Sequence, residues 1–126
     1  MGRLETREEL FKLVFEYTLV LEKNEMFEEE MQDTKLDKDY IVSTYNGIIE
    51  RYKELTEEIA KYTKGYNIDR VFKVDLALLL VAVYEIKYME DIPVAVSINE
   101  ALNLAKKYST EKSSSFINGV LANFAK

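Results

Sequence analysis

Two missing residue types limit the chemistry that this chain can offer. Its 126 residues include no cysteine and no histidine, which excludes a disulfide framework, thiolate chemistry, the usual general base and the commonest metal ligand. The acidic runs show no loop with the ligand spacing of a calcium site, and no glycine-rich phosphate loop is found in the sequence. The sequence therefore predicts a binding protein rather than an enzyme, with no cofactor and no bound metal.

A second group of side chains could bind RNA. Arginine makes bidentate contacts to phosphates, lysine adds salt-sensitive affinity, phenylalanine can carry a splayed base, and asparagine can read a base edge. Each lysine taken alone is better explained as a solubilising surface charge. A core position for Phe116 and helix capping for Asn118 are equal alternatives to RNA contact. The usable residues are Arg3, Arg7, Lys12, Lys106, Lys107, Lys112, Phe116 and Asn118.

The C-terminal candidates belong to a stretch with the pattern of two helices joined by a polar turn. Pro93 suits the first turn of a helix, because its φ is fixed and it lacks an N–H. Apolar residues then recur at three- and four-residue steps as far as Ala105. Residues 109–115 are expected to form a loop of helix-capping residue types, and helical spacing resumes at Phe116.

The centre of the fold is expected to be a helix over residues 73–88. Nearly every residue in this segment is apolar, which places the helix inside a bundle with neighbours on all sides. A buried strand fits the same pattern, but the segment is longer than a usual strand. The length therefore favours a helix.

Two further helices are expected before the central one. The first begins near Thr6, with Arg3 on a short arm before it, and its apolar stripe reaches Leu21. The second spans residues 39–63, where Gly47 permits close helix packing. The chain is therefore predicted to be all-α, with about six or seven helices and no strand.

Acidic residues are concentrated between these two helices. The net charge is −6, the wrong sign for simple nucleic-acid binding. Residues 22–39 contain eight acidic residues and three lysines, whereas the chain from Ala101 onward contains four lysines and one glutamate. The acidic segment is expected to be a solvated connector in which Phe27 and Met31 dock one short turn.

Nothing in the sequence indicates export or membrane insertion. The longest apolar run, residues 76–83, is too short to cross a bilayer. Glutamates interrupt the N-terminus, so no cleavable signal peptide is visible. A cytoplasmic location is expected.

The C-terminal blocks also carry a family resemblance. I-N-E-A-x-x-L-A-K-K-Y, followed by T-E-x-S-x-x-F-I-N-G-V-L, resembles the transcription antitermination factor NusB family. The similarity is strong in the C-terminal half, weaker over residues 1–17 and essentially absent from residues 19–40. It implies an all-α, NusB-like domain of two packed three-helix subdomains with about seven helices. The subdomains would cover about residues 1–64 and 65–126.

The resemblance also implies a function. NusB proteins pair with NusE, a small-subunit ribosomal protein, and bind single-stranded boxA RNA. They thereby help the RNA polymerase elongation complex to pass terminators. The free protein is expected to be a monomer or a homodimer. The positions that match the family are Arg3, Arg7, Lys112, Phe116 and Asn118 for RNA, and Phe15 and Asp75 for the protein partner.

Alternatives remain open for the partner residues and for RNA binding. Phe15 is equally well explained as a core residue, and Asp75 as dipole stabilisation at a helix N-terminus. The N-terminus reads R-L-E-T-R-E, with fewer arginines than the family pattern. Ser109 replaces the usual glycine, so it must tolerate or avoid the left-handed backbone conformation. A helical module that binds NusE with weak or no RNA binding is therefore the alternative function.

Overall fold

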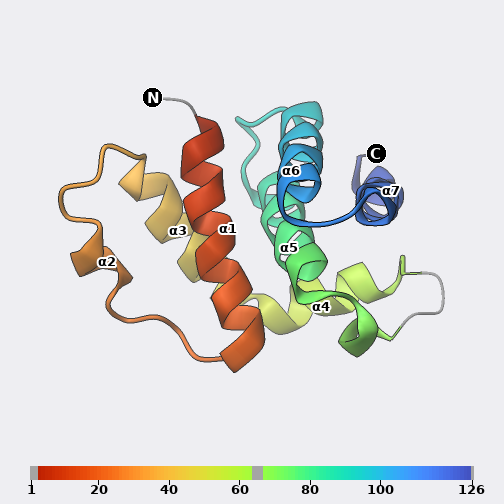
Figure 1. The fold of residues 1–126 in the computed structure, drawn as a ribbon, viewed down its shortest axis with the longest axis horizontal. Coiled ribbons are helices and arrows are strands. Elements are labelled where there is room, and N and C mark those ends of the chain that lie inside the picture. Colours follow the sequence, from red (N-terminus) through yellow and green to blue (C-terminus); the bar gives the residue numbers. More distant parts are fainter. Residues whose placement is uncertain (1–2, 64–66, 126) are drawn as a thin grey trace.

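The computed structural model describes residues 3–63 and 67–125, with the side chains of Arg3 and Leu4 outside this description. This part of the chain contains seven α-helices, two short 3-10 helices and no strand, which confirms the predicted all-α fold. The elements are α1 (Arg3–Val20), α2 (Phe27–Glu30), α3 (Lys38–Glu50), α4 (Tyr52–Ala60), η1 (Ile68–Arg70), α5 (Lys73–Tyr88), α6 (Val94–Tyr108), α7 (Glu111–Leu121) and η2 (Ala122–Phe124) (Figure 1).

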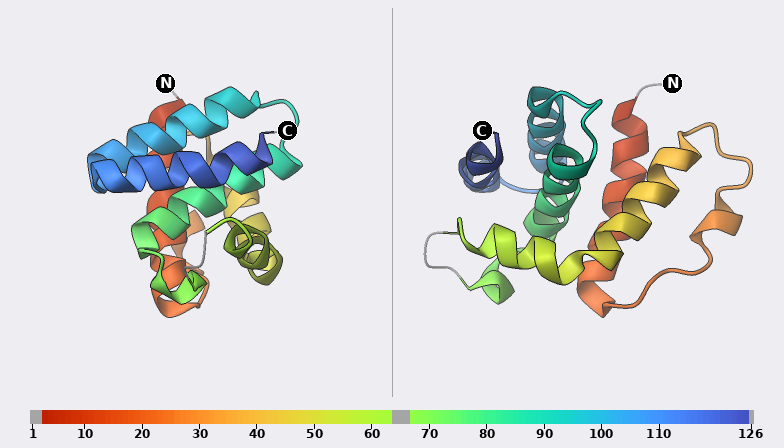
Figure 2. Two further views of the ribbon diagram at one scale, coloured as in Figure 1. Left: turned by 90° about the vertical axis from the view of Figure 1, so that its right-hand side faces the viewer. Right: turned by 180° about the vertical axis from the view of Figure 1, so that it is seen from behind.

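Helix α5 is the centre of the bundle, with the bounds that the sequence predicts. Its residues 76–83 are all buried, and α1, α3, α4, α6 and α7 all pack against it (Figures 1 and 2). The division into two subdomains near residue 64 stays a prediction. Both α1 from the first half and α6 from the second pack along α5.

A buried polar cluster ties four helices together inside this apolar core. The Arg7 guanidinium of α1 donates from Nε and Nη2 to the two carboxylate oxygens of Glu85 on α5, both at 2.9 Å. Ser97 of α6 donates to the same carboxylate at 2.8 Å, and the Tyr40 hydroxyl of α3 donates to it as well. Burying a carboxylate is costly unless donors satisfy it, so Glu85 fixes how these helices meet.

The segment predicted as one helix over residues 39–63 is two helices, which corrects that expectation. The break falls at Arg51, between α3 and α4, and the Arg51 guanidinium lies 4.6 Å from the centroid of the Tyr88 ring. Periodicity continues through the break, so the sequence pattern does not reveal it. The predicted close packing at Gly47 is confirmed, because a Cβ atom there would overlap the ring of Tyr84 on α5.

The ends of α1 also differ from the expectation. The helix begins at Arg3 rather than near Thr6. Thr6 is buried, and its hydroxyl oxygen accepts a hydrogen bond from the Asp37 N–H at 3.3 Å. At the other end, Leu21 has a positive φ of 56° and is exposed, so it leaves the apolar stripe.

The acidic connector is attached to α3. Phe27 of α2 is buried, as expected, with its ring 4.9 Å from that of Tyr45. The Asn24 N–H donates to the Tyr45 hydroxyl at 2.9 Å. The connector lies at the opposite end of the molecule from α7 (Figures 1 and 2). In the described part of the chain, no helix combines the length and the apolar character needed to cross a membrane.

The Arg7–Glu85 pair gives a test of this packing. We expect Arg7→Met to lower the free energy of unfolding by about 3–5 kcal/mol, because it leaves a buried carboxylate without its charged partner. Lys12→Met on the same helix is the control. Lys12 is exposed and lies 3.8 Å from Glu9, so its loss should cost less than about 0.5 kcal/mol. Urea denaturation measures both values. If the two variants lose similar amounts of unfolding free energy, the buried pair does not contribute more to stability than an exposed one.

Candidate nucleic-acid interface

The turn between α6 and α7 positions the C-terminal candidates. Ser109 has an extended backbone with φ −136°, so it avoids the left-handed region. The Thr110 hydroxyl oxygen accepts a hydrogen bond from the Ser113 N–H at 3.2 Å and caps α7. The helix therefore begins at Glu111, and most of the residues expected in a loop form its first turn.

Asp75, expected at the partner surface, is bonded to this turn. Its two carboxylate oxygens accept hydrogen bonds from Ser109 Oγ at 3.0 Å and from Ser113 Oγ at 2.9 Å. The residue is only 4% exposed, and it lies in the first turn of α5, where a negative charge complements the helix dipole. We therefore assign Asp75 an intramolecular role that fixes the α6–α7 turn on the central helix.

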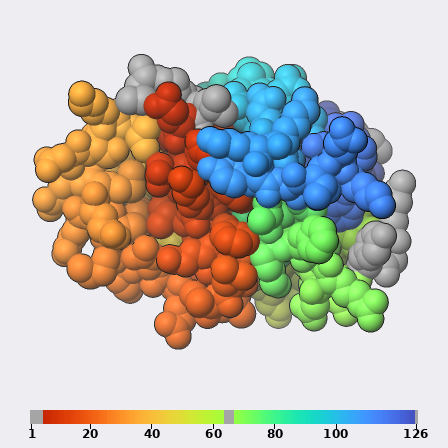
Figure 3. Space-filling view, in the orientation of Figure 1, coloured from red at the N-terminus to blue at the C-terminus, as the bar shows by residue number. Residues whose placement is uncertain are grey.

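Lys112 and Phe116 lie four residues apart on α7 and line one cavity of about 410 Å³. The opposite wall comes from η1 and the start of α5. Figure 3 shows the green atoms of that segment directly below the blue atoms of the C-terminal helices. Lys112 is exposed and Phe116 is half-buried. The lining residues are Arg70, Val71, Phe72, Asp75, Thr110, Lys112, Ser113 and Phe116.

Asn118 lies elsewhere on the same helix. Residues two positions apart in an α-helix are separated by roughly 200° around its axis, so Asn118 and Phe116 occupy different sides of α7. Asn118 is exposed and is not among the residues that line the cavity. The two side chains that the sequence motif places together would therefore meet different nucleotides of a bound strand.

Arg7 does not lie on this surface. Arg7 is only 3% exposed, and the guanidinium edge formed by Nε and Nη2 bonds the buried carboxylate of Glu85. A group held in this way would have to break the buried pair to reach a phosphate, so the structure gives Arg7 a role in the fold, and its phosphate contact stays a prediction. The Arg3 side chain lies outside the described residues.

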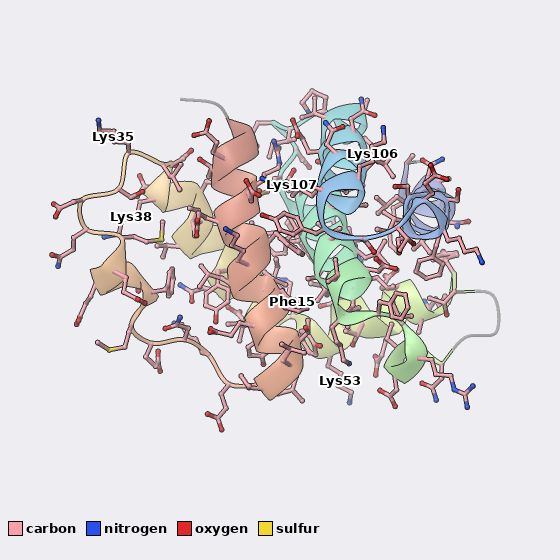
Figure 4. The ribbon with its side chains drawn as sticks, in the orientation of Figure 1. Phe15, Lys35, Lys38, Lys53, Lys106 and Lys107 are labelled. Carbon is pink, nitrogen blue, oxygen red and sulfur yellow. The ribbon has the colours of Figure 1, made fainter. Side chains whose placement is uncertain are left out.

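A lysine of α6 forms an ion pair with a glutamate of α1. Lys107 Nζ donates to Glu8 Oε2 at 2.6 Å, and the Tyr108 hydroxyl donates to the same carboxylate. The hydrogen bond from Lys107 lowers the pKa of the Glu8 carboxyl group, and the same bond raises the pKa of Lys107. Figure 4 shows Lys107 beside α1, with Lys106 farther along α6. Lys106, Lys107 and Lys112 are the exposed lysines nearest the α6–α7 turn in sequence, and of these Lys107 is paired with Glu8.

Phe15 lies on the face of α1 that is turned toward α5 (Figure 4). Its ring is half-buried and stacks on that of Phe11 with a centroid distance of 6.1 Å. It packs against the core, in agreement with the core alternative, while its remaining exposed edge leaves a partner contact open.

A second exposed apolar group follows at the end of α1. Leu19, Val20 and Leu21 are 57%, 57% and 59% exposed. Leu21 also lines a cavity of about 190 Å³ that includes Tyr52 and Ile68. Helical periodicity assigns Leu21 to the buried stripe, so the sequence interpretation missed this surface.

The sequence interpretation also missed two residues of the first cavity. Arg70 is exposed at the end of η1, and Phe72 is 67% exposed directly before α5. Neither residue is among the RNA-binding candidates named from the sequence. One signal could have distinguished Phe72: an aromatic residue next to a helix start, flanked by Arg70 and Lys73, is placed among charges rather than in an apolar pattern.

Comparisons with known proteins agree with this geometry. The family model described as the NusB family matches residues 4–126. The chain is 41% identical to the transcription antitermination protein NusB of Acetivibrio thermocellus, over 100% of this chain and 90% of that protein. It is 42% identical to the protein of the same name from Agathobacter rectalis, over 99% of this chain and 100% of that protein.

The fold agrees as well. A solved structure of NusB from T. maritima superposes with a TM-score of 0.89 at 32% sequence identity, covering 99% of this chain and 91% of that one. The match extends through all the helices that build the cavity and the exposed end of α1. With a family model over nearly its full length and relatives at about 40% identity, the chain belongs to the NusB family.

Proposed function

We propose that this protein is a transcription antitermination factor that binds boxA-like single-stranded RNA together with NusE. The observation that supports it best is the surface at the start of α7. There, exposed Lys112 and half-buried Phe116 line a cavity on a turn that Asp75 holds in place. Cations that attract phosphates, beside an aromatic ring that can stack on a base, are the combination that single-stranded RNA requires.

The roles of the candidates differ in this proposal. Lys112 attracts phosphates and acts without regard to sequence, whereas Phe116 stacks on a base. Asn118 reads the edge of a separate nucleotide, where the strand passes over the other side of α7. Arg3 adds a phosphate contact from the start of α1, and Arg7 supports the fold without touching RNA.

The protein partner takes the exposed apolar end of α1. Leu19, Val20 and Leu21 are consecutive exposed residues in a chain that buries most of its other large apolar side chains. An apolar surface of this kind is characteristic of a protein interface. Phe15 lies one and a half turns earlier on the same helix and would extend the contact.

A second candidate function is supported by the state of the basic residues. Arg7 is buried and Lys107 is paired with Glu8, so fewer cations face a bound strand than the family pattern implies. The second candidate is a module that binds NusE and has weak or no affinity for RNA. RNA binding measured with and without NusE separates the two candidates, because the second one predicts that NusE binds but does not raise the weak or absent RNA affinity.

The first prediction concerns base and phosphate contacts. With NusE present, Phe116→Ala should weaken binding of boxA-like RNA by about tenfold and scrambled RNA less, because a stacked base is lost. Lys112→Ala should weaken both RNAs equally and reduce the slope of log affinity against log salt by about 0.7, the contribution of one phosphate contact.

Fluorescence anisotropy across a salt series measures these effects. Lys35→Ala is the matched control, because Lys35 lies on the connector at the far end of the molecule (Figure 4). Equal losses on the two RNAs for Phe116→Ala would show that its ring does not touch a base. An unchanged salt slope for Lys112→Ala would remove its phosphate contact.

The second prediction concerns the partner surface. Val20→Asn should weaken NusE binding by about tenfold, since it places a polar amide at the centre of the apolar contact. Val96→Asn is the control, because Val96 is also an exposed valine in an α-helix but belongs to α6. Asparagine is uncharged, so neither substitution adds a charge that would interact with the helix dipole. Isothermal titration with NusE measures the two affinities, and equal affinities would place the partner elsewhere.

A further inference from the structure

The cavity between α7 and the start of α5 has a wall that the family motif does not explain. Phe72 is 67% exposed, although most large apolar side chains of this protein are buried. Its carbonyl oxygen accepts a hydrogen bond from the Leu76 N–H at 2.8 Å, so its backbone is fixed at the start of α5. The ring lines the cavity from a residue whose backbone belongs to a rigid element.

Two aromatic rings and two cations line this space. Phe72 comes from the start of α5 and Phe116 from α7, while Arg70 and Lys112 are both exposed. The cavity volume of about 410 Å³ lies in the range of small-ligand pockets. A flat ring that carries negatively charged groups on either side fits this lining, and a nucleotide within an RNA strand has that chemistry.

The acidic group of the cavity adds selectivity. Asp75 is only 4% exposed, and it lines the cavity. Each of its carboxylate oxygens accepts one serine hydroxyl, although each has two acceptor sites. Acceptor capacity therefore remains for a donor that enters the cavity. Cytosine, adenine and guanine carry an exocyclic amino group with two N–H donors, whereas uracil carries no amino group and offers only its ring N3–H.

We propose that this cavity is a nucleobase pocket that takes an amino-bearing base, with Phe72 stacked on the base, Asp75 accepting from its amino group, and Arg70 and Lys112 on the flanking phosphates. The proposal rests on the RNA-binding function proposed above. An apolar side chain of a protein partner would fit the two rings, but it would leave the carboxylate and both cations without a matching group.

The experiment compares fluorescein-labelled twelve-nucleotide oligo(rC) and oligo(rU) by anisotropy, with the full-length chain and NusE present. The wild-type protein should prefer oligo(rC). Phe72→Ala should weaken oligo(rC) binding by about tenfold, whereas Phe72→Tyr, which keeps the ring, should retain it. Asp75→Asn should lower the preference for oligo(rC) over oligo(rU), because the amide replaces one acceptor with a donor.

Met26→Ala is the matched control for loss of an exposed apolar side chain, since Met26 is 55% exposed on the connector side. Circular dichroism melting checks that every variant is folded. A ratio of two affinities does not change merely because part of the protein unfolds, so the Asp75→Asn result remains informative if that variant is less stable.

Three outcomes would overturn the proposal. Unchanged oligo(rC) binding by Phe72→Ala, with Phe116→Ala still impaired, would show that RNA binds without this pocket. Loss of NusE binding by Phe72→Ala, with RNA affinity intact, would assign the pocket to a protein side chain. If the wild-type protein binds neither oligonucleotide nor boxA-like RNA, the proposed function itself fails, and the pocket proposal fails with it.

Discussion

The central helix α5 buries two carboxylates, and the arrangement of the other helices follows from that constraint. Removing an ionised carboxylate from water costs several kcal/mol unless donors replace the lost water. Glu85 receives donors from α1, α3 and α6, and Asp75 receives two hydroxyls from the α6–α7 turn. Apolar packing alone would let neighbouring helices slide along α5. The two carboxylates require specific donors at specific heights, so they set the register of the bundle.

The sequence allowed the apolar part of this fold to be predicted. The bounds of α5, the all-α class and the close approach at Gly47 follow from composition, periodicity and residue size. The polar part could not be predicted in the same way. Arg7 and Glu85 are 78 residues apart, and periodicity gives no sign that one charged residue on a helix will be paired in the core while another stays in water.

The candidate site was predicted to a similar extent. The sequence named both Lys112 and Phe116, but it placed Lys112 in a loop before the helix, whereas in the structure both lie on α7 and line the same cavity. The local sequence could mark Phe72 as an aromatic residue among charges, but the start of α5 approaches α7 only through tertiary packing, so it could not place Phe72 and Arg70 beside Lys112. Asn118 shows the opposite case. It is close to Phe116 in the sequence motif, but the helix places the two residues on different sides of its axis.

Charge distribution explains how a chain with a net charge of −6 can present exposed cations beside α7. The acidic connector is attached to α3 through Phe27 and Asn24, at the end of the molecule that is opposite α7 (Figure 2). Interactions between exposed charges are largely screened beyond about 10 Å at moderate ionic strength. A strand near α7 would therefore experience Arg70 and Lys112 more strongly than the distant acids.

The anchoring of the α6–α7 turn has a further consequence for recognition. The walls of the cavity come from two elements that are distant in sequence, and Asp75 joins them through Ser109 and Ser113. A ligand that enters a preformed site does not have to order its walls, so less of the interaction energy is lost on binding. The serine at position 109 contributes directly, since a glycine there has no hydroxyl to donate to Asp75. In this chain, the departure from the family pattern therefore strengthens the support of the surface that we propose for RNA.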